Sequence, residues 1–266
     1  MPELAEVFYH SSIWKASVGE VFDVAWAHDK TRCCRHLDTA ELRKRLSGSE
    51  LLARYTHGKR MLFSFAGGVF LEVHLGMTGS LHRVGPDREE EKHDHLALRS
   101  AEAVLVFKDP RQFGKVALHL GTGDSLPDWW QTLPPEPQSD AFSRQRFETM
   151  LARRKRSVLK PLLLQQELFP GVGNWMADEI LWRAKLKPDR RLASLTEKEC
   201  EQLFLKTKWV CRNALAIIGK DYSDPPKSWL FLHRWKDGGT CPVSRKALRR
   251  DTIGGRTTCW SPEVQV

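Results

Sequence analysis

The spacing of apolar residues changes near the middle of the chain, and this change restricts the possible folds most strongly. Between Arg60 and Val73, apolar residues alternate or run together on either side of Gly67-Gly68, which predicts a β-hairpin with its turn at the glycine pair. Two further strands are expected before residue 121, at 103–107 and 116–120. From about residue 144 the pattern becomes helical and basic. An α+β protein is therefore expected, with a β-sandwich or barrel in its first part.

Helices and a linker divide the chain further. The segment 122–143 contains four prolines and many polar residues around Trp129-Trp130, which is typical of a linker between domains. Helices are expected at 39–46, with Asp38 or Thr39 as N-cap, and at 157–166, 175–184 and 196–217. The expected domains are 1–121, 144–222 and 223–266, joined by the linker 122–143. The last domain is expected to be a hairpin that pairs 229–235 with 253–260.

Composition limits the possible partners and compartment. The 266 residues are 41% hydrophobic, which is enough for a core, and the net charge is +9. Such an excess of base predicts a polyanionic partner, either nucleic acid or an acidic membrane surface. No apolar run reaches about 18 residues, so no membrane span is expected. There is no secretory signal pattern, so the six cysteines are expected to be reduced thiols in a cytosolic protein.

The first residues carry a possible catalytic group. Removal of Met1 would leave Pro2 with a free secondary amine next to the carboxyl group of Glu3. Such an amine can attack an aldehyde-like carbon and form an iminium ion, and the carboxyl can supply or accept the proton. A chain terminus titrates near pH 8 (roughly) against about 10.4 for lysine, so more of it is nucleophilic at neutral pH. Alternatively, Pro2 simply follows the start methionine.

Two turns carry residues that suit a disrupted base stack. In His74-Leu75-Gly76-Met77-Thr78-Gly79, Met77 is expected at a loop tip, where it could fill the apolar gap between unstacked base pairs. Arg111 and Phe113 follow Asp109 in a second turn and could fill the space that a flipped base leaves. Packing of Met77 and Phe113 in the core is the alternative interpretation.

Several other motifs favour contacts with phosphate. Gly171-Val172-Gly173-Asn174 precedes a helical run, and N–H groups at the start of a helix favour an anion. Arg256 lies at the expected tip of the last hairpin, and Lys59 lies in an early turn. The run 153–156 contains four consecutive cations, which are either a solvated helix face or a phosphate contact.

Taken together, these motifs resemble those of the formamidopyrimidine-DNA glycosylase/endonuclease VIII family of bifunctional DNA repair enzymes. The matching motifs, in chain order, are Pro-Glu-Leu-x-Glu-Val, an early Gly-Lys, His-Leu-Gly-Met-Thr-Gly, Asp-Pro-Arg-x-Phe-Gly, Gly-Val-Gly-Asn followed by Ala-Asp-Glu, and a hairpin arginine. The resemblance implies an N-terminal β-sandwich, a helix–two-turn–helix domain and a C-terminal β-hairpin finger.

The resemblance also implies residue roles. Pro2 would be the nucleophile at C1′ of the damaged nucleotide, Glu3 the general acid/base, and Lys59 an aid to base recognition or release. Glu6 and Glu179 match carboxylates near the lesion pocket. The residues that match DNA contacts are His74, Met77, Arg111, Phe113, Asn174 and Arg256.

The chain departs from the family pattern at the zinc finger. Two Cys-x-x-Cys pairs are usual there, but Cys241 is followed by Ser244 at the paired position and Cys259 by Pro262. Two thiolates do not make a closed tetrahedral site, and His233 would be only a third ligand. A finger without zinc, and no other cofactor, is therefore expected, held by hairpin pairing and by packing of Trp229, Trp235 and Trp260.

The function expected from this resemblance is removal of oxidised purines such as 8-oxoguanine and formamidopyrimidines, followed by strand cleavage through β,δ-elimination. The alternatives are an oxidised-pyrimidine glycosylase of the endonuclease VIII type and a non-catalytic protein that binds lesions or abasic sites. The expected partner is damaged double-stranded DNA, bound by a monomer. The expected location is the cytoplasm, or the nucleus in a eukaryote.

Overall fold

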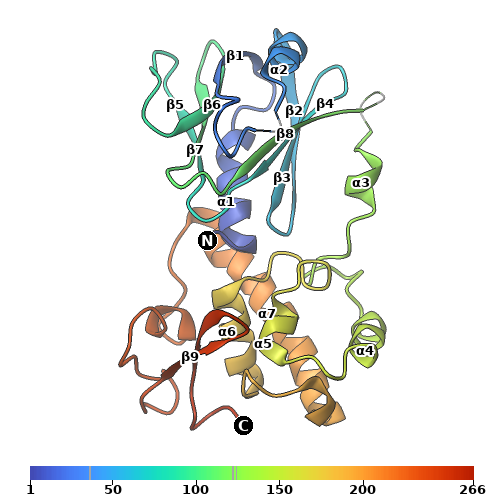
Figure 1. Cartoon of the computed structure of the whole chain (residues 1–266), viewed down its shortest axis with the longest axis vertical. Coiled ribbons are helices and arrows are strands. Elements are labelled where there is room, and N and C mark those ends of the chain that lie inside the picture. The colour runs from blue at the N-terminus through green and yellow to red at the C-terminus, as the bar shows by residue number, and fades with distance from the viewer. Residues whose placement is uncertain (36, 122, 124) are drawn as a thin grey trace. The chain divides into compact units, whose positions relative to one another are not determined.

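The structure is a computed structural model that describes residues 1–35, 37–121, 123 and 125–266 (Figure 1). The chain forms two compact units. The first contains Met1–Pro2 and Glu6–Leu133, and the second contains Glu3–Ala5 and Pro134–Val266. No helix in these ranges is long and apolar enough to cross a membrane.

The first unit is rich in strands. Its elements are α1 (Leu4–Lys15, whose first residues belong to the second unit), β1 (Val21–Ala27), α2 (Thr39–Leu46), β2 (Ser49–His57), β3 (Arg60–Phe65), β4 (Val69–His74), β5 (Ser80–Val84), β6 (Asp94–Arg99), β7 (Val104–Lys108), β8 (Lys115–Leu120) and α3 (Asp128–Gln131). The expected hairpin is confirmed, because β3 pairs with β4 in antiparallel register around Gly67 and Gly68, which both have positive φ. The expected helix 39–46 is also confirmed, and Asp38 is its N-cap.

The strands form one antiparallel sheet in the order β5-β7-β6-β1-β2-β3-β4-β8. Strand β1 pairs with both β2 and β6, so it joins two groups of strands, which Figure 1 shows on either side of it. Phe63 and Val73 from one group share a core with Leu98 and Phe107 from the other and with Trp14 of α1. The two groups therefore face each other across this core, which confirms the expected β-sandwich.

The second unit is helical and ends in a hairpin. Its elements are α4 (Arg144–Ala152), α5 (Leu159–Leu163), α6 (Asn174–Ala184), η1 (Leu192–Ser194), α7 (Glu197–Asp221), η2 (Leu230–His233), β9 (Arg249–Ile253) and β10 (Arg256–Trp260). Its core includes Phe147 of α4, Leu163 of α5, Ile180 of α6 and Phe204 of α7. A capping box at Thr196 and Glu199 starts α7, as its sequence indicates.

The predicted pairing of the last hairpin is wrong. Residues 229–235 form no strand and contain η2 instead, while β10 pairs with β9 from Arg256↔Ile253 to Trp260↔Arg249. A short apolar run does not distinguish a strand from a helical turn. Here Trp229 packs into the helical core and Leu230 into the core of the finger, so these two consecutive side chains belong to different hydrophobic cores.

The segment predicted to be a linker packs partly on the first unit. It contains α3, and Trp130 lies against Leu62 and Phe70 of the sheet. The division between the units falls between Leu133 and Pro134. Apolar aromatic side chains explain this packing, since burying Trp130 removes a large area from water.

The finger has a small core of its own. Cys241, Leu248 and Cys259 pack with Trp182 of α6 and Leu230 of η2. Of the three tryptophans expected to hold the finger, Trp260 is buried, Trp229 belongs to the helical core, and Trp235 is 55% exposed. The expected role is therefore wrong for Trp229 and Trp235.

Candidate active site

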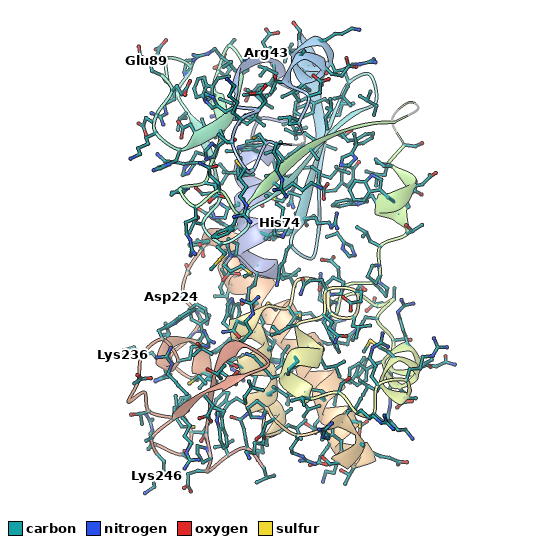
Figure 2. All side chains as sticks on the ribbon, in the orientation of Figure 1. Arg43, His74, Glu89, Asp224, Lys236 and Lys246 are labelled. Atoms are coloured by element: carbon teal, nitrogen blue, oxygen red, sulfur yellow. The ribbon has the colours of Figure 1, made fainter. Side chains whose placement is uncertain are left out.

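Sheet register gathers three of the predicted motifs at one end of the first unit. Arg60, which follows the Gly58-Lys59 turn, lies opposite His74 at the end of β4, and His74 lies opposite Lys115 at the start of β8. The turn before β3, the turn after β4 and the turn before β8 therefore leave the sheet side by side. Figure 2 labels His74 at this end of the sheet.

Asp109 connects two of these turns. Its carboxylate is fully buried and accepts a hydrogen bond from the Thr78 hydroxyl at 2.6 Å and another from the Gly114 amide at 2.7 Å. Gly76 allows the turns to approach closely, because a Cβ at this position would lie 2.3 Å from the carbonyl carbon of Phe113. Gly76 also has a φ of +61°, which favours glycine.

The three residues predicted to fill the space of a flipped base lie on these connected turns. Phe113 is 40% exposed, Arg111 is exposed and Met77 is half-buried. The Arg111 guanidinium lies 4.9 Å from the centre of the Phe113 ring, and the Arg32 guanidinium lies 5.0 Å from it. The alternative that Phe113 packs in the core is therefore wrong, because its ring is exposed. An exposed ring flanked by cations is suited to stacking on a base next to a phosphate.

His74 is held as a neutral imidazole in the same region. Burial lowers its pKa, and the nearby charges of Lys59 and Arg60 lower it further. Its Nδ1 accepts a hydrogen bond from the Gly76 amide at 3.0 Å, so the neutral ring carries its proton on Nε2. His74 can therefore donate a hydrogen bond from Nε2 to an anionic oxygen without carrying a charge. Lys59 lies in the two-residue turn and has the compact charge that a phosphate or a departing base requires.

In the second unit, Glu3 occupies the start of α6. One carboxylate oxygen accepts from the Trp175 amide at 2.9 Å, and the other accepts from the amides of Gly173 at 2.9 Å and Met176 at 3.1 Å. The side chain is only 2% exposed. The sequence predicted that the amides at this helix start favour phosphate, but the structure shows them bound to the Glu3 carboxylate. The helix dipole and these donors favour the ionised form of a carboxylate.

Gly173 makes this arrangement sterically possible. A Cβ at Gly173 would lie 2.2 Å from the Glu3 carboxyl carbon and 2.5 Å from one of its oxygens. Its φ of −123° is ordinary, so the requirement for glycine comes from the close approach of the carboxylate and not from the backbone.

Asn174 and the hairpin tip lie together. The Asn174 side-chain amide donates to the carbonyl of Thr257 at 2.8 Å, next to Arg256, while its own buried Oδ1 has no partner. Gly254 and Gly255 make the turn between β9 and β10, and Arg256 is exposed at its end. The two predicted phosphate contacts are thus brought to one place in the second unit.

Glu179 is deeply buried. Its carboxylate accepts from Arg183 Nε at 2.7 Å and from the Phe231 amide at 3.1 Å. Burial raises its pKa to about 7, against the opposing effect of the Arg183 charge. Glu179 therefore connects α6 to η2, and its side chain is fully buried in this structure. Glu6 is buried in the first turn of α1.

A buried charged cluster next to Glu3 was missed by the sequence analysis. Lys160 is fully buried, donates to the Asn174 carbonyl at 2.7 Å and forms an ion pair with Asp178. Asp178 also accepts from Arg234 Nε at 3.1 Å and from the Cys259 amide at 3.1 Å. Burial lowers the pKa of Lys160, although Asp178 opposes this shift. Asp178 thus ties α5, the segment after η2 and β10 together.

The finger residues do not fit a zinc ion. Cys241 and Cys259 lie in the apolar core of the finger, and the Ser261 side chain interacts with the Cys241 thiol. His233 Nε2 donates a hydrogen bond to the Lys227 carbonyl, 2.9 Å away. In the part of the chain that the structure describes, no three His, Cys, Asp or Glu side chains are placed to hold a metal. All six cysteines are free.

Comparison with known proteins identifies the family. The formamidopyrimidine-DNA glycosylase N-terminal domain model matches residues 1–116, and the formamidopyrimidine-DNA glycosylase H2TH domain model matches residues 133–224. The formamidopyrimidine-DNA glycosylase of Thermus thermophilus is 35% identical over 86% of this chain and 88% of its own length. That of Roseiflexus is 32% identical over the whole of both chains. The chain belongs to the formamidopyrimidine-DNA glycosylase family.

Solved structures give the same result. The Lactococcus lactis Fpg bound to DNA with an abasic site has a TM-score of 0.85, with 26% identity and 99% of both chains covered. The same enzyme bound to DNA with an oxidised pyrimidine also scores 0.85. The protein is thus a DNA glycosylase of base excision repair and an enzyme that acts on damaged DNA.

Proposed function

We propose that this glycosylase is bifunctional, that Pro2 is its nucleophile, and that its preferred lesions are oxidised purines of the 8-oxoguanine and formamidopyrimidine type. The observation that carries the proposal is the Glu3 carboxylate, which three backbone amides fix at the start of α6, one peptide bond away from Pro2. A positioned carboxylate beside a secondary amine is the minimum apparatus for iminium chemistry.

The chemistry follows from these two groups. After removal of Met1, the neutral Pro2 nitrogen attacks C1′, the glycosidic bond breaks, and the base leaves with its electron pair and takes up a proton. The amine then loses its proton, the C1′–O4′ bond breaks and O4′ takes up a proton, which leaves an open-chain iminium ion between Pro2 and the sugar. Loss of a C2′ proton then expels the 3′-phosphate, and a second elimination expels the 5′-phosphate. Hydrolysis of the iminium releases Pro2.

Glu3 has a defined task in this sequence. Its hydrogen bonds favour the carboxylate, which can accept a proton from the attacking amine or the sugar and return it during ring opening. Its negative charge also stabilises the cationic iminium. A neighbouring Lys160–Asp178 pair keeps the carbonyl of Asn174 and the start of α6 in place.

The predicted DNA contacts would hold the distorted DNA. Met77, Arg111 and Phe113 fill the space left by the extruded nucleotide, while His74 and Lys59 face its phosphate or base. Asn174 and Arg256 contact the phosphates at the kink. Extrusion of a base costs a few kcal/mol, roughly, and inserted side chains offset this cost. The partner is double-stranded DNA, bound by a monomer wherever the cell keeps its DNA.

The preference for oxidised purines rests on Met77, Arg111 and Phe113, which resemble the space-filling residues of the purine-directed branch of the family. One observation favours smaller bases. The connection from α7 to η2 runs only from Tyr222 to Trp229, so it offers little chain to cover a large base. Oxidised pyrimidines are therefore the second candidate, and the Lactococcus lactis Fpg has been solved with DNA that contains one. Excision rates on duplexes with a single 8-oxoguanine, formamidopyrimidine or oxidised pyrimidine decide between them.

The finger is proposed to work without zinc. Its core of Cys241, Leu248 and Cys259 and the contacts of Asp178 with Arg234 and the Cys259 amide supply connections that a metal would otherwise make. Burial disfavours the Cys241 thiolate, but hydrogen bonding with Ser244 lowers its pKa to about 7. One equivalent of zinc per chain in the purified protein would contradict this proposal.

Borohydride trapping tests the catalytic proposal. Reduction during reaction with abasic-site DNA should give a covalent protein–DNA adduct in the wild type and in Glu3→Gln at a lower rate, and none in Pro2→Gly with a blocked terminus. A protein that binds lesion DNA and never gives an adduct would instead be a non-catalytic lesion-binding protein.

A further inference from the structure

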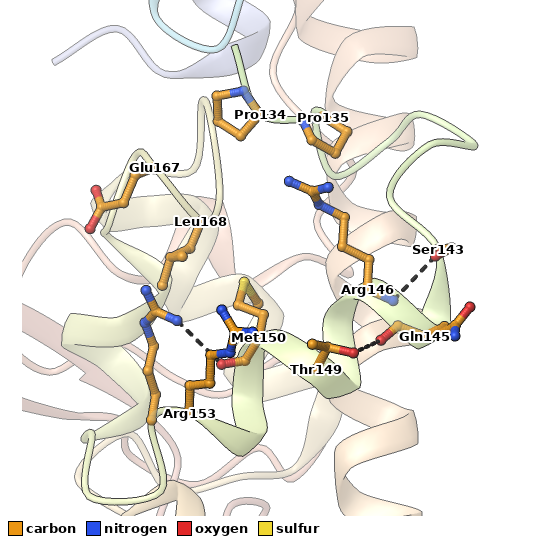
Figure 3. Close-up of a pocket in the computed structure, with 11 residues that line it drawn as sticks. Pro134, Pro135, Ser143, Gln145, Arg146, Thr149, Met150, Arg153, Glu167 and Leu168 are labelled. Atoms are coloured by element: carbon orange, nitrogen blue, oxygen red, sulfur yellow. Dashed lines mark hydrogen bonds between the residues drawn. The ribbon is translucent and has the colours of Figure 1, made fainter. Parts of the chain in front are cut away.

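A basic groove on α4 includes two arginines of the run 153–156, for which the sequence left a solvated face and a phosphate contact as alternatives. It is lined by Arg146, Arg153 and Arg154 together with Met150 and Leu168, and encloses about 480 Å³ (Figure 3). Arg146 and Arg153 are exposed. In Figure 3, the Arg146 side chain extends from the helix toward Pro135, across the groove. We call these three arginines and their hollow the α4 groove.

Helical spacing aligns its charges. Arg146 and Arg153 are seven residues apart, with Thr149 and Met150 between them, so they share one face of the helix and its end. The separation along the axis is about 10 Å at about 1.5 Å per residue. Phosphates recur along one strand of B-DNA at about 3.4 Å of axial rise each, so two arginines at this separation can contact different phosphates of the same strand.

The charges of the α4 groove are not neutralised by acidic neighbours. The opposite face of α4 carries an ion-pair network in which Arg144 contacts Glu148 at 2.7 Å and Glu201 at 2.8 Å. In the parts of the chain that are described, the side chains of Arg146 and Arg153 have no ion pair. Arg154 donates to the Met150 carbonyl at 3.3 Å, and among the described residues Glu167 is the single acidic one that lines the groove.

The backbone that presents these arginines is fixed. The turn after α4 is held by hydrogen bonds from the Ala193 amide to the Lys155 carbonyl at 2.8 Å and from the Leu192 amide to the Ser157 carbonyl at 2.9 Å. Arg191 donates to the Arg156 carbonyl at 3.0 Å. A concave surface that presents several arginines from a fixed turn is suited to phosphate, which arginine binds through paired N–H groups.

We propose that the α4 groove is a second, sequence-independent contact for the phosphate backbone of undamaged duplex flanking the lesion. Within the second unit, Figure 1 shows α4 on the far side of α5, α6 and α7 from the β9–β10 hairpin, so Arg256 cannot serve the same phosphates. The proposal rests on the proposed function only in taking DNA as the partner. An acidic protein is the other polyanion that such a row could bind.

Duplexes of two lengths distinguish binding at the α4 groove from binding at the lesion site. We expect Arg146→Glu/Arg153→Glu to bind a short lesion duplex of about 12 base pairs as the wild type does, and to bind a lesion-free duplex of about 40 base pairs more weakly. Loss of two phosphate contacts should lower the salt slope by about 1.8, so wild-type affinity for the long duplex should fall about 12-fold more than that of the variant between about 50 and 200 mM salt.

A matched control removes the effect of net charge. Lys44→Glu/Lys198→Glu makes the same change in total charge at exposed positions on α2 and in the first turn of α7. It should keep the wild-type salt slope, and thermal unfolding should show that both double variants are folded. Arg146→Gln/Arg153→Gln removes the two positive charges without adding negative charges that repel phosphate. It should reproduce half or more of the decrease in salt slope seen with Arg146→Glu/Arg153→Glu.

Three results would overturn the proposal. The first is that the groove variant binds the long duplex as tightly as the wild type. The second is that the control variant loses as much affinity for the long duplex as the groove variant. The third is that the groove variant loses as much affinity for the short duplex as for the long one. The first would leave an acidic protein as the occupant. Failure of the wild type to bind or cut the short lesion duplex would instead contradict the proposed function, so the two failures are distinguishable.

Discussion

Gly173→Ala is the substitution that most sharply tests the placement of Glu3. The new Cβ would lie 2.2 Å from the Glu3 carboxyl carbon, which is 1.2 Å inside the 3.4 Å at which ordinary van der Waals contact begins (3.4 − 2.2 = 1.2). The carboxylate must therefore move by about this amount, because the other neighbour of the Cβ is the start of α6. A misplacement of this size is enough to lower a catalytic rate by about 100-fold.

The same movement has a cost in stability. At least one of the three hydrogen bonds to the carboxylate would break, and a hydrogen bond to a charged group contributes about 1.5–3 kcal/mol. Alanine is also a poorer N-cap than glycine, which adds about 1 kcal/mol. We therefore expect Gly173→Ala to lower the free energy of unfolding by about 3 kcal/mol and the single-turnover excision rate by about 100-fold.

A double-mutant cycle isolates the contact. In a Glu3→Ala background the clash disappears, so Gly173→Ala should then cost only the capping term of about 1 kcal/mol. The free energies come from urea unfolding of all four proteins, and the rates from quenched single-turnover reactions on a lesion duplex. An equal loss of stability in both backgrounds would refute the inferred approach of Glu3 to Gly173.

Three further outcomes are expected. Asp109→Ala should lower the free energy of unfolding by about 2–3 kcal/mol. It should also weaken binding to lesion duplex more than binding to intact duplex, measured by fluorescence anisotropy. Equal weakening of both would show that Asp109 does not position the turns that carry Met77 and Phe113. The pKa of Glu179 is raised to about 7 in the folded protein, so its contribution to stability is present below about pH 4.5 and is lost as the pH rises to 7. In urea unfolding, the free energy of unfolding of the wild type should fall over this range by about 3 kcal/mol relative to that of Glu179→Gln. Parallel pH profiles of the two proteins would contradict the raised pKa. Metal analysis by mass spectrometry should find well under one zinc per chain, and chelators should leave excision unchanged, whereas loss of activity with a chelator would place a metal in the finger.

The part of the fold that was predicted correctly is the part encoded by local patterns. The glycine pair at 67–68 and the cap at Asp38 each act within a few residues, so the elements that they delimit are found where expected. Helix α1 was missed because its apolar residues do not keep to one face, and most of its first turn is buried.

The site was predicted from motifs, but the contacts that hold it were not. The sequence shows Met77 and Phe113 in separate turns, and only the buried carboxylate of Asp109 and the missing side chain of Gly76 explain why the turns touch. The cluster of Lys160 and Asp178 was missed because the partners are 18 residues apart and their pairing depends on tertiary packing. A charged residue inside the apolar run at 159–163 was the one local sign of it.

Peptide mapping of the trapped complex tests the central claim most directly. After borohydride reduction on abasic-site DNA and digestion of both partners, tandem mass spectrometry should locate the sugar remnant on the nitrogen of residue 2, in chains that have lost Met1. A remnant on Lys59 or another lysine, or full excision by protein that still carries Met1, would contradict the assignment of Pro2 as the nucleophile.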